Sequence, residues 1–291
     1  MSWVHWNSHE GVKLIGQNKY NHPQPWGPWT KIMGVVAKCE GNHDTVVSYD
    51  GTGVTWGFMK WTFTSGRLQR LLEYFKSINY FDMADKAKVE DTNLFDKYFV
   101  DKGQQIFERY GFKIRNGEFI YNNVALNPQI KRSRELIDAI CMGRMRYDIP
   151  KDQKKHATNL AVLFSQVGRK PEIAFAQIEF AKGEFKRALQ VKRPLLGEYG
   201  TLANLLDGYW DSYVSAVFFN LWQNNPAAAY KLFIRAKNDS SPVSFPTEVW
   251  NQLKKSKFGN WSYAKPENKG PRIRRIALAV KEFYGVNLPV R

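Results

Sequence analysis

The stretch between Gly27 and Gly41 constrains the fold more than any other part of this 291-residue chain. Pro28 stands in the first turn of a predicted helix, where proline is favoured, and Gly41 stands just after the last turn, where glycine is favoured. Apolar residues recur between them at the i, i+3, i+4, i+7 spacing of a helix face: Ile32, Val35, Val36 and Cys39. The pattern predicts one amphipathic helix that ends at Glu40.

A glycine-rich β-hairpin is predicted directly after this helix. Residues 45–49 and 54–59 are rich in β-branched and aromatic side chains, and Asp50-Gly51 between them is a strong hairpin signal. The chain therefore places a carboxylate, Asp50, in a turn ten residues after the helix-terminal Glu40. Two carboxylates, one protonated and one ionised, are the minimum equipment for cleaving a glycosidic bond.

The surroundings of the two carboxylates favour different roles. Glu40 lies at the carboxyl end of a helix, where the helix dipole disfavours negative charge, and we expect aromatic side chains of the return strand to desolvate it. Both effects raise the pKa of a carboxyl group, which suits a general acid. Asp50 in a wet turn should stay ionised, and Thr55 on the return strand is placed to hold a water molecule beside it. Each of the three also has a purely structural explanation, as a solvated helix end, a turn residue or a strand hydroxyl.

These residues resemble the lysozyme superfamily of glycoside hydrolases, which includes goose-type lysozymes, phage muramidases and lytic transglycosylases. The resemblance covers residues 28 to 78 and includes Gly57-Phe58-Met59-Lys60, which is similar to the Gly-Leu-Met-Gln-like stretch of that superfamily. The segment from Asp50 to Gly57 also resembles the Asp-Gly-x-Gly-x-Thr-x-Gly hairpin of the family 46 chitosanases. That resemblance implies an inverting reaction in which Asp50 is the base and Thr55 helps to position water. The chain departs from these patterns in having Lys60 in place of Gln and a shorter interval between Glu40 and Asp50.

The resemblance implies a mainly α (α+β) fold, a lysozyme-like helical domain in which a small β-hairpin lines the active-site cleft. Apolar spacing predicts further helices over residues 68–75, 171–189, 202–213 and 226–236. An alternating stretch around Asn116-Gly117, residues 110–124, predicts a second hairpin. The breaks near residues 148–150 and 238–242 are too short for flexible linkers. We therefore expect residues 1–291 to form a single enlarged domain, in which residues 28–78 carry the catalytic elements and the basic, aromatic segment 238–291 packs back onto them.

Aromatic, apolar and polar side chains near the two carboxylates are candidates for binding a sugar chain: His43, Tyr49, Trp56, Phe58, Met59, Lys60 and Trp61. His43 has a simpler interpretation as a turn residue. No cofactor and no metal site are expected, because the five histidines form no HExxH motif and no cluster with cysteine. Cys39 and Cys141 are expected to remain thiols unless folding brings them together.

The net charge narrows the substrate class. With 43 Lys and Arg against 27 Asp and Glu, the formal charge is +16 and the pI is about 9.7, so the chain attracts polyanions and repels polycations. Chitosan is a polycation, whereas bacterial peptidoglycan and its anionic wall polymers carry carboxylates and phosphates. Nucleic acid fits the charge too, but the sequence has no zinc-finger spacing, basic zipper or RNA-recognition signature. The predicted partner is therefore peptidoglycan.

The beginning of the sequence lacks a basic stretch followed by an apolar run, and no segment has the roughly 20 apolar residues that span a bilayer. We therefore expect synthesis in a host cytoplasm without a signal peptide, followed by action on the cell wall after release or as part of a virion. This pattern favours a bacteriolytic bacteriophage protein, either an endolysin or a virion-associated lysin.

Together these features favour a peptidoglycan hydrolase of muramidase type, with Glu40 as general acid and Asp50 and Thr55 positioning water. Two alternatives stay open: a lytic transglycosylase that cleaves the same glycan bond, and a non-enzymatic basic virion or nucleic-acid-binding protein. A separation of about 5 Å between the carboxyl groups would indicate a retaining enzyme, and roughly 6.5 to 9.5 Å an inverting one. A Glu40 buried in a salt bridge, with no groove for a sugar chain, would favour the binding protein.

Overall fold

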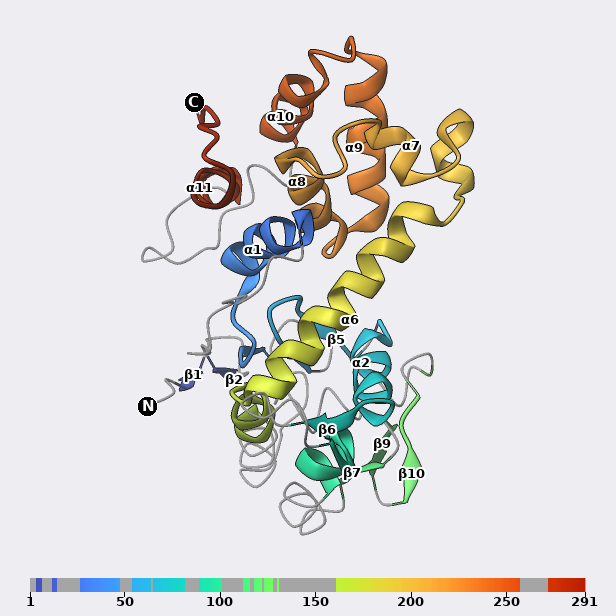
Figure 1. The fold of residues 1–291 in the computed structure, drawn as a ribbon, viewed down its shortest axis with the longest axis vertical. Coiled ribbons are helices and arrows are strands. Elements are labelled where there is room, and N and C mark those ends of the chain that lie inside the picture. The colour runs from blue at the N-terminus through green and yellow to red at the C-terminus, as the bar shows by residue number, and fades with distance from the viewer. Residues whose placement is uncertain are drawn as a thin grey trace. The chain divides into compact units, whose positions relative to one another are not determined.

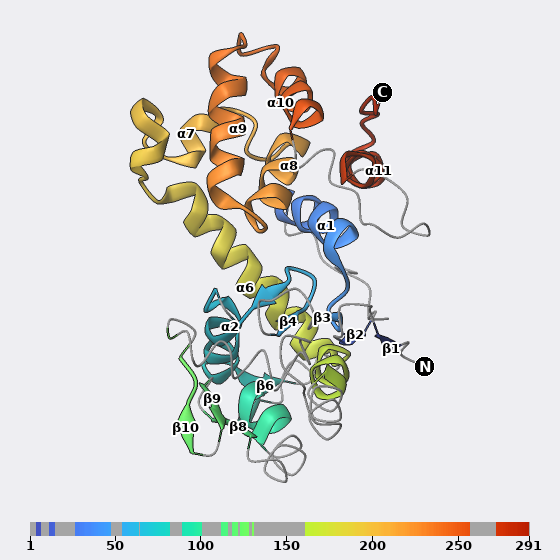
Figure 2. The same cartoon turned by 180° about the vertical axis from the view of Figure 1, so that it is seen from behind.

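The helix predicted to end at Glu40 forms as α1, Pro28–Glu40, and Gly41 follows it directly. Burial extends beyond the predicted apolar face to further residues of the helix: Trp29, Met33, Gly34 and Ala37. The reason is that α1 packs against two other helices, α8 (Tyr213–Trp222) and α11 (Arg272–Tyr284). Both lie beside α1 in opposite views of the structure (Figure 1, Figure 2).

The computed structural model describes residues 4–6, 12–14, 27–47, 54–63, 65–81, 89–100, 112–115, 118–121, 123–127, 130, 161–256 and 272–290 (Figure 1). The chain divides into two compact units. Unit 1 comprises Met1–Lys19 and Gly41–Phe180, and unit 2 comprises Tyr20–Glu40 and Ala181–Arg291. The expectation of one enlarged domain over residues 1–291 stays a prediction.

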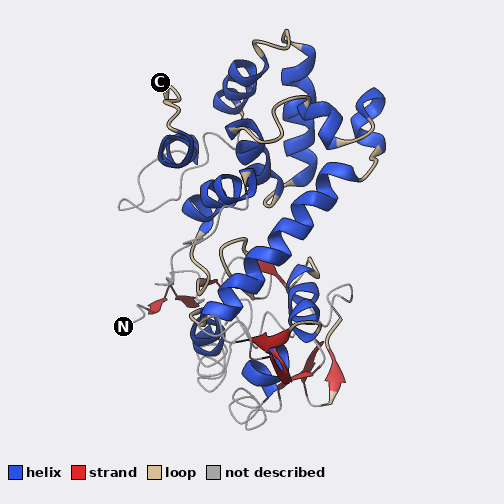
Figure 3. Ribbon diagram, in the orientation of Figure 1, coloured by secondary structure: helices blue, strands red, loops and turns tan. Residues whose placement is uncertain are grey.

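All regular elements that the structure describes in unit 2 are helices, joined by loops and turns (Figure 3). Its elements besides α1, α8 and α11 are the second part of α6 (Pro171–Gln190), the 3-10 helix η2 (Pro194–Tyr199), α7 (Leu202–Leu206), α9 (Pro226–Asn238) and α10 (Phe245–Lys255). The predicted helix starts at Pro171 and Pro226 are confirmed. Proline is favoured there because the first helical turn has no intrahelical partner for a backbone N–H, and proline lacks that group. The most apolar helix, α8, is buried from Val214 to Leu221 and contacts α1, α9 and α11.

The single helix predicted over residues 202–213 is wrong, because the chain breaks there into α7 and α8. Asp207 and Gly208 adopt φ angles of 24° and 74°, which are incompatible with a right-handed helix. The Ser212 side chain then accepts a hydrogen bond from the Val214 N–H at 3.2 Å and caps the start of α8. Apolar spacing alone does not detect such a break.

Every strand that the structure describes belongs to unit 1. Five strands form an antiparallel sheet in the order β1-β2-β3-β4-β5: Val4–Trp6, Val12–Leu14, Val46–Val47, Thr55–Trp56 and Trp61–Thr62. The predicted pairing of the two runs after α1 is confirmed, since Val46 lies opposite Trp56 in the β3–β4 register. Residues 48–53, where the turn at Asp50 was predicted, lie outside the described residues. The sheet is larger than the predicted hairpin because β5 and two N-terminal strands extend it.

The other elements of unit 1 follow this sheet in the sequence: α2 (Arg67–Lys76), β6 (Asn79–Phe81), β7 (Val89–Asn93), the π-helical segment η1 (Asp96–Val100), β8 (Phe112–Arg115), β9 (Glu118–Tyr121), β10 (Val124–Ala125), a helix over residues 161–168 and the first part of α6. The predicted helix over residues 68–75 is confirmed as α2, and the second hairpin as the β8–β9 pair. The Trp56 ring lies 5.0 Å from that of Phe164 and 6.0 Å from that of Phe75, within an aromatic core.

The structure thus confirms a mainly helical fold with small antiparallel sheets, while the lysozyme-like arrangement stays an expectation. Within the described part of the chain, no helix combines the length and the apolar character needed to cross a membrane.

Candidate functional site

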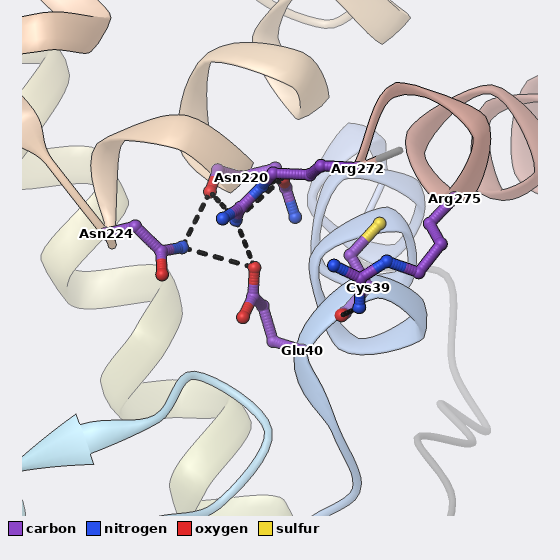
Figure 4. A network of polar contacts seen from close by, with 6 residues as sticks. All are labelled: Cys39, Glu40, Asn220, Asn224, Arg272 and Arg275. Carbon is purple, nitrogen blue, oxygen red and sulfur yellow. Dashed lines mark hydrogen bonds and ion pairs between the residues drawn. The ribbon is translucent and has the colours of Figure 1, made fainter. Parts of the chain in front are cut away.

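Glu40 ends α1 with its side chain buried in unit 2, where 1% of that side chain is exposed. Its Oε1 accepts hydrogen bonds from Arg272 Nη2 and, at 3.1 Å, from Asn224 Nδ2 (Figure 4). The other carboxylate oxygen, Oε2, points away from these two donors (Figure 4). Because Arg272 begins α11 and Asn224 follows α8, one carboxylate oxygen joins three helices.

The guanidinium of Arg272 is held in turn by Asn220 on α8. Arg272 Nε and Nη2 donate to Asn220 Oδ1 at 3.3 and 3.2 Å, and Nη2 also donates to the Asn220 carbonyl at 3.1 Å. The same carbonyl accepts a hydrogen bond from Asn224 Nδ2 at 3.1 Å. Both Arg272 and Asn220 are fully buried, and a buried charge is tolerated when it is paired and hydrogen-bonded in this way.

A second arginine of α11 binds the end of α1. Arg275 Nη1 donates to the Cys39 carbonyl at 3.1 Å (Figure 4). Carbonyl groups in the last turn of a helix carry partial negative charge, so a cation is favourable there. At the surface, Lys38 Nζ and Glu282 Oε2 lie 3.0 Å apart, and each of these side chains is about half exposed. The two helices are therefore joined by buried and by exposed polar contacts.

The contact with Arg272 alters the electrostatics that the sequence led us to expect. Burial and the helix end both favour a protonated Glu40, but a guanidinium in direct contact favours the ionised carboxylate. A general acid must carry a proton when it acts. In this arrangement Glu40 is therefore a well-positioned carboxylate whose neighbour opposes its protonation. The buried salt bridge is also one of the two features that were expected to distinguish a binding protein from an enzyme.

The structure describes only some of the residues that were predicted to act with Glu40. Asp50 and Tyr49 lie outside the described residues, so the separation of the two carboxyl groups stays a prediction. Thr55 lies on β4, hydrogen-bonded between β3 and β5, and is 1% exposed. This burial differs from the expected position of the Thr55 hydroxyl beside a wet turn.

Four of the predicted sugar contacts are fully buried in unit 1: Trp56, Phe58, Met59 and Trp61. The Phe58 ring lies 5.4 Å from that of Trp61 and 5.0 Å from that of His43. These side chains pack as core residues, which differs from the exposed cleft wall that we expected. The sequence pattern could not separate the two roles, because an apolar strand face is the same whether it covers a core or binds a ligand.

His43 and Lys60 both lie in turns of unit 1. His43 Nδ1 lies 3.1 Å from Gln177 Oε1, and Gln177 Nε2 donates to the His43 carbonyl at 3.1 Å, so α6 holds the segment that follows α1. The turn interpretation of His43 is confirmed. Lys60 has a φ of 48°, and its N–H donates to the Gly57 carbonyl at 3.1 Å in the turn between β4 and β5. The His43 side chain is buried against Phe58, which differs from the exposed sugar contact that we expected, whereas a sugar contact for Lys60 stays a prediction.

Sequence reasoning missed the three residues that surround Glu40: Asn220, Asn224 and Arg272. A signal was present for one of them, since Arg272 stands four residues before the buried Ile276 and eight before the buried Val280. A cation in register with the apolar face of a helix is a candidate for a buried ion pair. No local pattern identifies its partner, because Glu40 and Arg272 are 232 positions apart.

Among the described residues, no group of three or more His, Cys, Asp or Glu side chains is arranged to hold a metal ion. Cys39 is a buried free thiol, and Cys141 lies outside the described residues.

Comparisons with models of protein families, with curated proteins and with solved structures find no match for this chain.

Proposed function

We propose that this protein is a peptidoglycan hydrolase of the lysozyme type, in which Glu40 is the general acid and Asp50 and Thr55 position the attacking water. One observation supports this role above all others: at the end of α1, Asn224 and Arg272 hold the carboxylate of Glu40 in one orientation. Proton transfer to a glycosidic oxygen requires a carboxyl group that is fixed relative to the bond. Strands β3, β4 and β5 follow α1 in the sequence, which is the order that the motif resemblance implies.

In the proposed reaction, Glu40 donates a proton to the leaving glycosidic oxygen while the bond to the anomeric carbon breaks. Water that has given a proton to Asp50 attacks that carbon. In the transglycosylase alternative, Glu40 first gives its proton to the leaving group and then removes one from a hydroxyl of the same sugar, so that an anhydro sugar forms. The two reactions differ in product mass by one water molecule.

The net charge of +16 supports an anionic polymer as the substrate. Peptidoglycan with its wall polymers meets this requirement, while protonated chitosan does not. We further propose that the protein acts as a phage endolysin or a virion-associated lysin, on the cell wall of a bacterial host.

The test is digestion of purified peptidoglycan by the wild type and by Glu40→Gln, followed by zymography and mass spectrometry of the products. We expect Glu40→Gln to lower turnover by roughly 10²-fold or more, because an amide cannot donate the proton. The matched control is Glu282→Gln, which changes an exposed glutamate of the same unit and should leave turnover unchanged. Circular dichroism must show each variant folded at the assay temperature, since Glu40→Gln leaves the buried Arg272 without its anionic partner. Near wild-type digestion by folded Glu40→Gln would refute the assignment.

A second candidate function, a non-enzymatic basic virion or nucleic-acid-binding protein, is favoured by the burial of Glu40 in an ion pair with Arg272. In that case Glu40 has a structural role, and Glu40→Gln should lower stability without changing binding. The measurement is the affinity for duplex DNA as a function of salt, which should fall log-linearly when phosphate contacts dominate. Strong DNA binding by a chain that cleaves no glycan would favour this candidate over the hydrolase.

A further inference from the structure

The contacts of Arg272 fix the orientation of its guanidinium in addition to pairing it with the Glu40 carboxylate. Its Nε and Nη2 are both fixed by Asn220, and the same Nη2 reaches Glu40 Oε1. The guanidinium is planar, so these contacts determine both its position and its tilt. Asn224 donates to the same carboxylate oxygen from the end of α8. The carboxylate of Glu40 is therefore oriented through one oxygen, and the other oxygen is turned away from these donors (Figure 4).

We propose that Arg272 is a positioning residue for the glycosidase reaction: it orients Glu40 and holds it ionised at rest, so that the enzyme works best at acidic pH. This inference rests on the proposed function, because it assigns Glu40 the role of the proton donor. In this proposal the proton is carried by Oε2, which is buried and is turned away from Arg272 and Asn224 (Figure 4). Protonation then weakens the attraction between Glu40 and Arg272, and transfer of the proton to the leaving oxygen restores the ion pair.

Other charges near Glu40 have separate partners. Among the described residues, the charged and titratable side chains on the adjoining parts of α1 and α11 are Lys38, Cys39, Arg272, Arg275 and Glu282. His43 and Asp44 follow Glu40 along the chain, where His43 Nδ1 lies 3.1 Å from Gln177 Oε1 and Asp44 Oδ2 lies 3.1 Å from Arg169 Nε. Arg275 binds the Cys39 carbonyl, and Lys38 pairs with Glu282 at the surface. The neighbouring residues of α8 and its end, Asn220 and Asn224, are neutral. Because Arg272 is in direct contact with the Glu40 carboxylate, its removal should change the ionisation of Glu40 more than removal of Lys38 or Arg275.

The first experiment measures peptidoglycan digestion against pH. Arg272→Met removes the cation, and we expect the alkaline limb of the profile to move up by about one pH unit or more, because an opposite charge in contact shifts a carboxyl by roughly that amount. Arg272→Lys keeps the charge and should keep the wild-type limb, with a lower kcat because the fork geometry is lost. The control is Arg274→Met, which removes an exposed cation from the same helix and should leave the profile unchanged.

A second variant keeps the test decisive if Arg272→Met fails to fold. Asn224 is exposed, and Asn224→Asp places a second carboxylate beside Oε1 of Glu40 without opening the core. A like charge favours the protonated form, so the alkaline limb should again move up. Asn224→Ala removes a single neutral hydrogen bond and should move the limb less.

The second experiment follows the ionisation of Glu40 directly, without any substrate. In protein labelled with ¹³C-glutamate, the Glu40 carboxyl signal is identified by its loss in Glu40→Gln and is followed through a pH titration. We expect wild-type Glu40 to titrate at lower pH than Glu40 in Asn224→Asp or Arg272→Met.

The two experiments separate the failure of this inference from the failure of the proposed function. An active enzyme whose Glu40 signal and pH profile are the same in wild type, Asn224→Asp and Arg272→Met overturns the inference alone. Altered titration with an unaltered activity profile also overturns it, because Arg272 would then act on Glu40 without affecting the reaction. A chain that cleaves no glycan at any pH overturns the proposed function, and with it the catalytic role of Arg272.

Discussion

The ion pair between Glu40 and Arg272 should behave as a single energetic unit, and a double-mutant cycle tests this. Both side chains are 1% exposed, so removing one partner leaves an uncompensated buried charge. Glu40→Leu and Arg272→Met should therefore each lower the free energy of unfolding by about 3–5 kcal/mol. The double variant removes both charges and leaves mainly the buried amide oxygen of Asn220 without its partner, at about 1–3 kcal/mol, because the exposed Asn224 still donates to the Asn220 carbonyl. It should thus be more stable than the sum of the single changes predicts, by at least about 2 kcal/mol.

The assay is urea unfolding followed by far-UV circular dichroism, with equal m-values required before free energies are compared. The control cycle is Lys38→Met with Glu282→Gln, because that pair joins the same two helices but its side chains are 54% and 51% exposed. Its coupling should stay below about 1 kcal/mol, as is usual for surface pairs. If the effects of Glu40→Leu and Arg272→Met simply add, within about 0.5 kcal/mol, the two buried charges are not energetically coupled.

Two further predictions concern stability. Gly168→Ala should destabilise unit 1 by roughly 1–3 kcal/mol or more, because a Cβ there would lie 2.6 Å from the backbone oxygen of His43; an unchanged melting temperature would show that this close approach is absent. Burial, and then the nearby Asp211 carboxylate, raise the pKa of Tyr284 above its ordinary value. The folded chain therefore keeps the Tyr284 proton at a pH where the unfolded chain has lost it, so this contribution to stability is complete below about pH 10 and is lost above it. Between pH 9 and 11, the free energy of unfolding measured by urea titration should fall less for Tyr284→Phe than for the wild type. An equal fall in both proteins would contradict the raised pKa of Tyr284.

Elements defined by local chemistry were predicted well. The first residue of α1, α6 and α9 is a proline that the sequence marks directly. The β8–β9 hairpin was found because Asn116-Gly117 favours a tight turn between two alternating runs. The break between α7 and α8 was missed. The positive φ at Asp207 is a property of the backbone in the turn, and the spacing of apolar residues does not reveal it.

The sequence by itself determined that Glu40 ends a helix and that a β-hairpin follows it, because proline, glycine and alternating side chains act on their immediate neighbours. Only the tertiary structure decided which groups surround the Glu40 carboxylate. Arg272 lies 232 positions away, and its side chain meets Glu40 because α1, α8 and α11 bury their apolar faces against one another. Within unit 1, packing against Phe75, Phe164 and Phe180 likewise decided that Trp56 and Trp61 lie in a core. The physical reason is that burial and charge pairing depend on which distant segments pack together. That packing is determined by the folding free energy of the whole unit, which no local stretch of sequence contains.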